Sequence, residues 1–262
     1  MNILVIGKPN DDISALVKNS KYTDKVYTAL NHGNTEFPNI EYRNFNELIE
    51  KALALKIDIA INVDKTLIKK GIAEDFAAGK VNLISVNKKW LNLETSRLCA
   101  KELLNHYKIK TPKIIRTPLK FPIVIKTDTP NFEYTANTMN EVVSCMKKLE
   151  GRKTFFEEFV TGSTIDVYSM WDKKNIKYFY NTKSLTEVQI DRLDLIKTKL
   201  CFMFSDEQAD FIGIFDIKLT WYKNDWCITG FDMGATIPPN ILDGKDFLYL
   251  LNAALYQKLG EL

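Results

Sequence analysis

Short apolar runs and segments with helical spacing alternate along the first part of the chain. The apolar runs have the length of buried strands, and we expect such strands at Asn2–Ile6, Lys25–Ala29, Ile57–Asn62 and Val81–Val86. In the segments between them apolar residues recur three or four positions apart, which predicts helices at residues 11–19, 44–54 and 66–78. Strands that alternate with helices in this way predict a parallel sheet wrapped by helices, and such sheets bind ligands beyond the carboxyl ends of their strands.

The pattern changes after residue 90. Residues 92–106 have an apolar face and predict one long helix, and the three prolines in Lys110–Pro122 predict an extended connector. Later apolar segments pair as hairpins, of which the clearest joins Gly213–Tyr222 to Trp226–Met233. We therefore expect a parallel α/β domain at residues 1–90 and an α+β part at residues 91–262. Its two lobes, at about residues 112–160 and 161–262, would enclose a cleft.

Composition narrows the classes of function. The chain has 262 residues, of which 45% are hydrophobic and 26% are charged, as is typical of a folded globular protein. No run of about twenty apolar residues occurs, so we expect no membrane partner. The net charge of +3 comes from lysines mixed with acidic residues, and we expect no nucleic-acid partner. Four cysteines without a CxxC pair and two histidines argue against a structural zinc site, and free thiols suit a reducing cytoplasm.

Several segments follow one another in the order of a known family. The opening MNILVIG, the segment DKVYTALNHGNT, and LETSR followed by KELL are similar to motifs of phosphoribosylamine–glycine ligase. Further along, PIVIK at Pro122–Lys126, FEEFVTG at Phe156–Gly162 and the hairpin at Gly213–Gly234 resemble that family's phosphate-binding strand, adenine hinge and last core hairpin. The similarity covers nearly the whole chain and ends about where the family's final domain would begin. The chain thus resembles this branch of the ATP-grasp superfamily.

The resemblance implies a fold class and a reaction. It implies an α/β and α+β protein, with an ATP-grasp fold that follows an N-terminal Rossmann-like pre-ATP-grasp domain. It implies an ATP-dependent carboxylate–amine ligase, in which ATP phosphorylates a carboxylate and an amine attacks the acyl phosphate. ATP and Mg²⁺ (or Mn²⁺) would be the cofactors, and the partners would be a small carboxylate and an amine in the cytoplasm, as in purine biosynthesis. The substrates stay unassigned, and homo-oligomer formation stays open.

Three basic residues are the candidates for phosphate contact. Lys126 ends a buried apolar strand, from which its ammonium would reach the phosphates in a wet cleft, so that its loss would affect ATP binding rather than folding. A lysine that only extends from a strand end into solvent is the alternative. The resemblance also implies ATP binding by Lys101 and a catalytic role for Arg97, which share one helix face. A solvated basic face is the alternative there.

Other residues take their expected roles from the same resemblance. Glu157, Glu158, Phe159 and Val160 would form the adenine hinge, where backbone groups read the edge of the base. Two further residues, in loops that follow expected strands, would bind substrate: Asn34 and Asp64.

Asp216 and Asp232 are the candidate metal ligands. Each lies among apolar residues on one strand of the expected hairpin, which would bring the two carboxylates together. Acids in such surroundings are costly to bury without a partner, and a divalent cation would be one. Pairing with Lys218 or with a backbone amide is the alternative.

Some positions depart from the family's pattern. Residues Thr129–Thr135 contain neither glycine nor lysine where the family has a glycine-rich phosphate lid. Thr164 stands in place of a ribose-binding glutamate, and Gly230 stands in place of a metal-binding glutamate. These departures favour a second hypothesis, in which the chain is a non-catalytic descendant that binds nucleotide or a protein partner.

Overall fold

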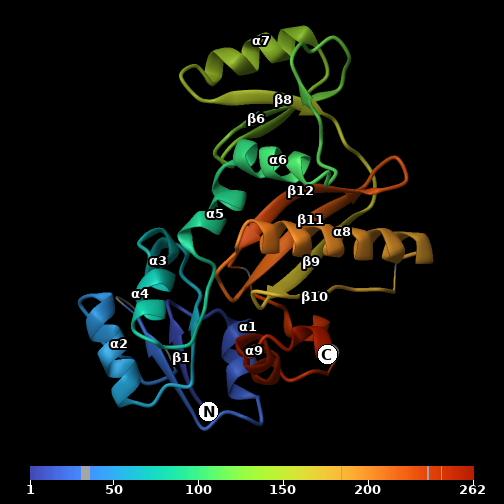
Figure 1. Cartoon of the computed structure of the whole chain (residues 1–262). Helices are drawn as coiled ribbons and strands as arrows, with labels where there is room; N and C mark the ends of the chain where they lie inside the picture. The colour runs from blue at the N-terminus through green and yellow to red at the C-terminus, as the bar shows by residue number, and fades with distance from the viewer. Residues whose placement is uncertain (31–35, 184, 235, 243) are drawn as a thin grey trace.

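The structure is a computed structural model, and it describes residues 1–30, 36–183, 185–234, 236–242 and 244–262. Its described part contains three four-stranded sheets, which lie one above another in Figure 1. The N-terminal sheet lies at the bottom of that view, and the sheet of the C-terminal half lies in the middle. The sheet at the top has the smallest apolar core and is called the smallest sheet for that reason. This mixed architecture confirms the expected α/β and α+β fold class.

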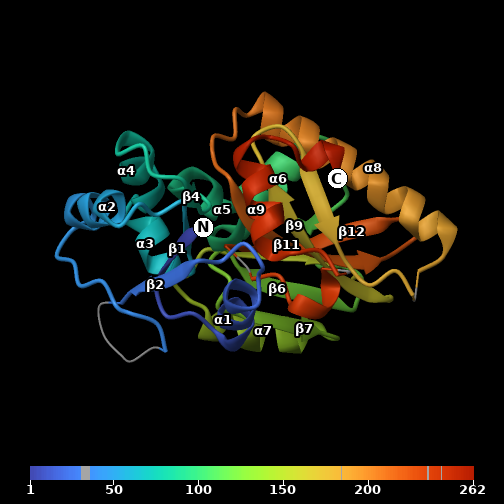
Figure 2. The same ribbon diagram turned by 90° about the horizontal axis from the view of Figure 1, so that it is seen from below.

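The N-terminal sheet is parallel, in the order β2-β1-β3-β4. Its strands are β1 (Asn2–Ile6), β2 (Lys25–Ala29), β3 (Ile59–Asn62) and β4 (Leu83–Ile84). Its strands are apolar on both sides because helices cover both faces. These helices are α1 (Asp11–Lys18), α2 (Phe45–Ala54), α3 (Lys65–Lys69), α4 (Ile72–Ala78) and α9 (Phe247–Leu255). The C-terminal helix α9 packs beside α1 (Figure 2), so the end of the chain completes the first domain's core.

The middle sheet is antiparallel, in the order β10-β9-β11-β12. Its strands are β9 (Thr164–Trp171), β10 (Ile176–Phe179), β11 (Gly213–Trp221) and β12 (Trp226–Met233). One face carries large apolar side chains such as Phe215 and Ile217, which pack against helix α8 (Glu187–Asp206). The opposite face carries Asp216, Lys218 and Asp232, because successive residues of a strand alternate between faces.

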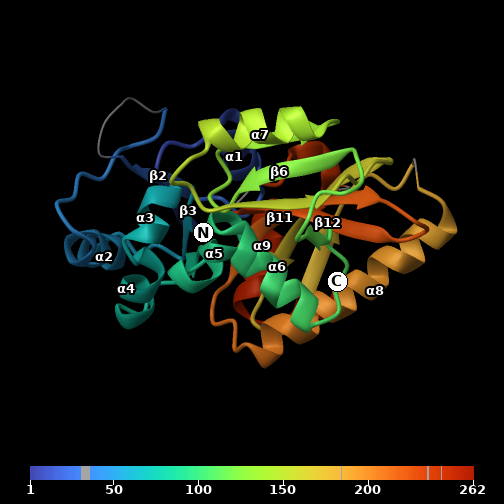
Figure 3. The ribbon, with the colours of Figure 1, turned by 90° about the horizontal axis from the view of Figure 1, so that it is seen from above.

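The smallest sheet has the order β5-β8-β6-β7. Its strands are β5 (Ile114–Ile115), β6 (Ile123–Thr127), β7 (Glu133–Ala136) and β8 (Thr154–Glu158). Helix α7 (Met139–Lys148) covers its outer face, where Ile123 and Ile125 form a small core with Val142. Figure 3 shows α7 outside this sheet, whose other face turns toward α6 (Arg97–His106) and the middle sheet. The alternate residues of β6 and β8 therefore point into the space between the two sheets.

The helix predicted over residues 92–106 is instead two helices, and this prediction was wrong. Helix α5 (Lys88–Thr95) ends at Ser96, which takes an extended conformation and caps α6 by accepting a hydrogen bond from the Cys99 backbone N–H. The Ser96 hydroxyl donates to Asp128, which follows β6, at 2.8 Å. Hydrogen bonds from the Leu98 N–H and from Ser96, together with Lys153, hold the pKa of Asp128 below its usual value although burial opposes this. The helix break thus attaches the start of α6 to the smallest sheet.

Two other elements differ from the expectations. The helix expected at residues 66–78 is divided into α3 and α4 at Gly71, whose φ of +90° a helix does not allow. Helix α8 was not predicted, although Thr186 and Gln189 form a capping box at its start. The domain boundary expected at residue 90 falls inside α5. Among the described residues, none of the helices has both the length and the apolar composition to cross a bilayer.

Candidate functional site

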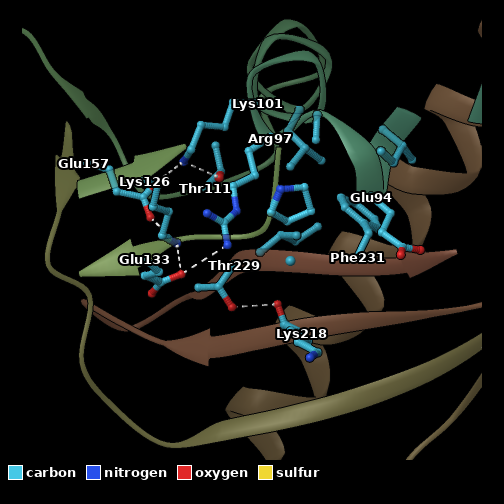
Figure 4. Close-up of a pocket in the computed structure, with 16 residues that line it drawn as sticks. Glu94, Arg97, Lys101, Thr111, Lys126, Glu133, Glu157, Lys218, Thr229 and Phe231 are labelled. Atoms are coloured by element: carbon cyan, nitrogen blue, oxygen red, sulfur yellow. Dashed lines mark hydrogen bonds and ion pairs between the residues drawn. The ribbon is translucent and has the colours of Figure 1, made fainter. Parts of the chain in front are cut away.

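A cavity of about 310 Å³ lies between α6, the smallest sheet and the edge strand β12 (Figure 4). Helix α6 contributes Arg97 and Lys101 to its wall, β6 contributes Lys126, and β8 contributes Glu157. These four residues were all candidates from the sequence, and they come from segments up to sixty positions apart (157 − 97 = 60). The fold therefore brings them together around one cavity.

The Glu157 carboxylate forms ion pairs with two lysines that come from different elements. Its Oε1 lies 2.5 Å from Nζ of Lys126, and its Oε2 lies 2.6 Å from Nζ of Lys101. All three residues are buried, with exposed fractions of 2% for Glu157, 6% for Lys101 and 7% for Lys126. Buried charges persist only where opposite charges and hydrogen bonds compensate them. This charged triad therefore joins α6 to the smallest sheet.

The ammonium of Lys101 lies close to three protein groups. Besides Glu157, it donates to the carbonyl of Pro112 at 2.6 Å and to the Thr111 hydroxyl at 3.3 Å. Burial lowers the pKa of Lys101, and the neighbouring charge of Lys126 lowers it further, while Glu157 opposes the shift. These contacts fix the Lys101 side chain, and its ion pair with Glu157 positions that carboxylate beside Lys126.

Arg97 and Lys126 both face a carboxylate that the sequence reasoning missed. The guanidinium of Arg97 donates to the Phe132 carbonyl at 2.8 Å, and its Nη2 lies 3.5 Å from Oε2 of Glu133. The same oxygen of Glu133 lies 3.2 Å from Nζ of Lys126. Glu133 is about half exposed and belongs to the segment where a glycine-rich lid was expected. A carboxylate therefore lies between the two cations that were expected to contact phosphate.

The expected adenine hinge is only partly at the cavity. Glu157 lines it, whereas Glu158, Phe159 and Val160 are absent from its described lining. The side chain of Glu158 turns instead to Lys113, whose backbone N–H it accepts at 3.1 Å. Strand β8 ends at Glu158, and within the described residues the main-chain groups of Phe159 and Val160 have no hydrogen-bond partner. Their N–H and carbonyl groups remain available to a ligand.

Asp216 and Asp232 lie directly opposite each other on β11 and β12. Asp216 is buried, and its Oδ1 has no hydrogen-bond partner in the described part of the chain. Burial raises the pKa of Asp216 to about 6, with further contributions from the charges of Asp166 and Asp232. The expected meeting of two carboxylates is present, and one of them lacks a partner.

The second carboxylate of this pair is engaged by a lysine from the N-terminal domain. Nζ of Lys65 lies 2.5 Å from Oδ1 of Asp232 and 2.8 Å from Oε2 of Glu94. These hydrogen bonds raise the pKa of Lys65 although burial opposes the shift. Glu94 also accepts the backbone N–H of Met233 at 2.7 Å. Lys65 and Glu94, which sequence reasoning did not single out, thus connect the N-terminal domain and α5 to β12.

The two expected substrate-binding residues have different outcomes. Asn34 lies outside the described residues. Asp64 caps α3, where its Oδ1 accepts the backbone N–H of Thr66 at 2.8 Å and the Thr66 hydroxyl at 2.7 Å.

The residues around Asp216 fit a divalent cation only with help from a ligand. Among the described residues, no cluster of three or more His, Cys, Asp or Glu side chains is suited to hold a metal. At the position of the expected third ligand, Gly230 offers no side chain, and Lys65 already pairs with Asp232. The unpartnered oxygen of Asp216 remains the strongest candidate ligand. Because Mg²⁺ is commonly held by one or two carboxylates with phosphate oxygens and water, a nucleotide would have to complete the site.

Several known proteins resemble the chain in sequence, at low identity. No protein-family model matches the chain. The phosphoribosylamine–glycine ligase of Fusobacterium nucleatum is 22% identical over 70% of this chain, which spans only 50% of that relative. The ligase of the same name from Clostridium acetobutylicum is 23% identical over 100% of this chain and 76% of its own length.

Solved structures show the same fold. The phosphoribosylamine–glycine ligase of Thermotoga maritima has a TM-score of 0.72 at 16% identity, over 99% of this chain and 76% of that one. The D-alanine–D-alanine ligase of Bacillus anthracis complexed with ATP has a TM-score of 0.62 at 15% identity, over 100% and 99% of the two chains. The chain therefore has the ATP-grasp fold. Within this class it resembles phosphoribosylamine–glycine ligase, as its motifs indicated.

The burial of Lys126 corrects one expectation and leads to a first prediction. Although Lys126 lines the cavity, its side chain is buried against Glu157, so Lys126→Met leaves Glu157 with one ammonium partner instead of two. We expect the free energy of unfolding to fall by about 3 kcal/mol, as when one partner of a buried ion pair is removed. Urea unfolding measures this loss. Lys147→Met on the exposed side of α7 is the matched control, and equal stability of the two variants would contradict the prediction.

The second prediction concerns pH. The raised pKa of Asp216 means that its contribution to stability is fully present below about pH 4 and is lost as the pH rises through about 6. Asp216→Asn cannot ionise, so we expect it to become more stable than the wild type by about 2 kcal/mol at neutral pH, without divalent cations. Urea unfolding at several pH values between about 5 and 8 checks the trend. A difference that does not grow with pH would show that Asp216 does not titrate in this range.

Proposed function

We propose that this protein is an ATP-dependent carboxylate–amine ligase that acts through an acyl phosphate. The observation that carries the proposal is the buried triad of Lys101, Glu157 and Lys126, beside Arg97, at a cavity between the two lobes of an ATP-grasp fold. Positive charge at this position suits phosphoryl transfer, because negative charge on the transferred group must be stabilised. Since ATP is an intracellular cosubstrate, we also propose a cytoplasmic location.

The unpaired main-chain groups after β8 support a position for the adenine. The N–H and carbonyl groups of Phe159 and Val160 would read the edge of the base, next to Glu158 at the end of the strand. The phosphates would then extend toward Arg97 and Lys126. Glu133 would have to give way to them, and its half-exposed side chain has room to do so. Glu157 and Lys101 would keep Lys126 in place during binding.

The carboxylate and amine substrates are proposed to enter beside the carboxyl ends of the parallel strands. Ligands of parallel sheets bind at these ends, where Asp64 follows β3. Asn34, which follows β2 in the sequence, is proposed to contribute as well. Glycine and phosphoribosylamine stand in the names of the relatives, and for this chain we propose only the classes carboxylate and amine.

Mg²⁺ (or Mn²⁺) is the proposed companion of ATP. Asp216 would hold it, with Asp232 as a second ligand once Lys65 releases that carboxylate. The cation would supply Lewis-acid stabilisation of charge on the phosphates. Arg97 and Lys126 would hold the remaining phosphate oxygens. Asp216 and Asp232 are absent from the described lining of the cavity, so the cation would lie beside the cavity, beyond Lys218 and Gly230.

A non-catalytic nucleotide-binding or partner-binding role is the second candidate function. Two observations favour it: Gly230 supplies no ligand where a metal-binding glutamate was expected, and Glu133 occupies the space between the phosphate-binding cations. In this role the cavity would bind a nucleotide without turnover, or the fold would serve only a protein partner.

The third prediction separates these candidates through the coupling of metal and nucleotide. Isothermal titration calorimetry should show little Mg²⁺ binding to the protein alone and appreciable binding with ATP present. Asp216→Asn should abolish this coupling. Gly230→Glu should strengthen it, since a Cβ at residue 230 meets only ordinary van der Waals neighbours, the nearest being Cδ of Lys218 at 3.7 Å. Asp191→Asn on α8 is the control for loss of a carboxylate.

The outcomes are distinct. Release of ADP and phosphate with a suitable carboxylate and amine supports the ligase. Coupled binding without turnover across a panel of such substrates supports the non-catalytic role. A wild type that binds no ATP at millimolar concentration with Mg²⁺ leaves the partner-binding role alone, and an unchanged Asp216→Asn variant removes the metal role from Asp216.

A further inference from the structure

The positively charged side chains around the cavity differ in how far the protein already neutralises them. Three of the four are ion-paired with a carboxylate: Arg97, Lys101 and Lys126. Lys218 is the fourth, and within the described residues no carboxylate lies within 4.0 Å of its ammonium. An incoming anion gains more electrostatic energy beside an uncompensated cation than beside one that already has a partner. Of these four cations, Lys218 therefore provides the largest gain in electrostatic energy to a negatively charged ligand.

Lys218 reaches the cavity from the wall opposite the triad. It lies on β11, and Figure 4 shows it on the strand side, across the cavity from Lys126. On β12 its opposite residue is Gly230. A Cβ at residue 230 would lie 3.7 Å from Cδ and 3.8 Å from Cβ of Lys218, so the lysine extends along the space above the glycine. The absence of a side chain at residue 230 thus leaves room for an exposed lysine to line the cavity.

In the described part of the chain, the carboxylates near Lys218 form no ion pair with its ammonium. Asp166 lies opposite Lys218 on β9, and Asp216 precedes it by two residues on the same face of β11. Burial, Asp166 and Asp232 raise the pKa of Asp216, and the positive charge of Lys218 acts against that shift. The ammonium is therefore close enough to influence these acids, yet it keeps its hydrogen-bonding capacity for a ligand.

We propose that Lys218 binds the phosphate end of the nucleotide, a role for which the glycine at residue 230 makes room. The proposal rests on the nucleotide-binding function proposed above and names a phosphate-binding residue for it. A phosphate chain in the cavity has Arg97 and Lys126 on one side and Lys218 on the other. Lys218 thereby brings positive charge to the place where a metal-binding glutamate was expected, and nucleotide binding depends less on a divalent cation.

Calorimetric titration with three probes tests the assignment: ATP, inorganic tripolyphosphate and adenosine, each in EDTA and in Mg²⁺. We expect Lys218→Met to weaken binding of ATP and of tripolyphosphate by about 10- to 100-fold in EDTA, the usual effect of losing a charged hydrogen bond. Adenosine binding should stay unchanged, and Lys218→Arg should retain most of the affinity. Lys147→Met on α7 removes the same charge far from the cavity and serves as the matched control.

Each outcome decides a separate point. Unchanged affinity of Lys218→Met for ATP and tripolyphosphate overturns the assignment and leaves the nucleotide site in place. ATP and tripolyphosphate binding that depends on Lys218, without turnover of any carboxylate and amine, supports the assignment and overturns the ligase. Tripolyphosphate binding without ATP binding overturns both. A loss of adenosine affinity together with a lower melting temperature shows a structural role and also overturns the assignment. A wild type that binds none of the probes overturns both proposals.

Discussion

The buried contact of Glu157 with Lys101 and Lys126 is the interaction on which the candidate site depends. It joins a helix to a central strand of the smallest sheet, and it places two ammonium groups within 2.6 Å of one carboxylate. Removal of Glu157 leaves Lys101 buried without a carboxylate, and removal of either lysine leaves Glu157 with one ammonium partner instead of two. Both changes are more costly than removal of an exposed ion pair. The same contact weakens phosphate binding, because a lysine that is already paired with a carboxylate attracts a phosphate less strongly.

A second group of charges links the N-terminal domain to the corner of the middle sheet where Asp216 and Asp232 lie. Lys65 bridges Glu94 and Asp232. The carboxylate that the hairpin register places opposite Asp216 is therefore already paired with a lysine. Asp216 is left buried with a raised pKa, close to the unpaired Lys218. In the proposed function, nucleotide binding at this corner requires an exchange of partners among lysines, carboxylates and phosphates.

Local sequence pattern was sufficient wherever neighbouring residues decide the structure. The parallel strands at Asn2–Ile6 and Lys25–Ala29 and the hairpin of β11 and β12 follow from apolar periodicity and turn residues. The pattern was insufficient at Ser96, because the helix break there depends on a hydrogen bond to Asp128, thirty-two residues later (128 − 96 = 32). Helix α8 was not predicted because polar residues interrupt its apolar face, although the sequence contains its capping box.

The sequence by itself determined the fold class, the order of the elements and four of the charged residues that meet at the cavity, since these depend on periodicity and on collinear motifs. Only the tertiary structure decided which charges are paired. Lys126 was expected in a wet cleft and is buried against Glu157, and Glu133 and Lys65 take partners from distant segments. The physical reason is that the electrostatic free energy of a charged group depends on its burial and on neighbours within a few ångströms, and a linear sequence specifies neither.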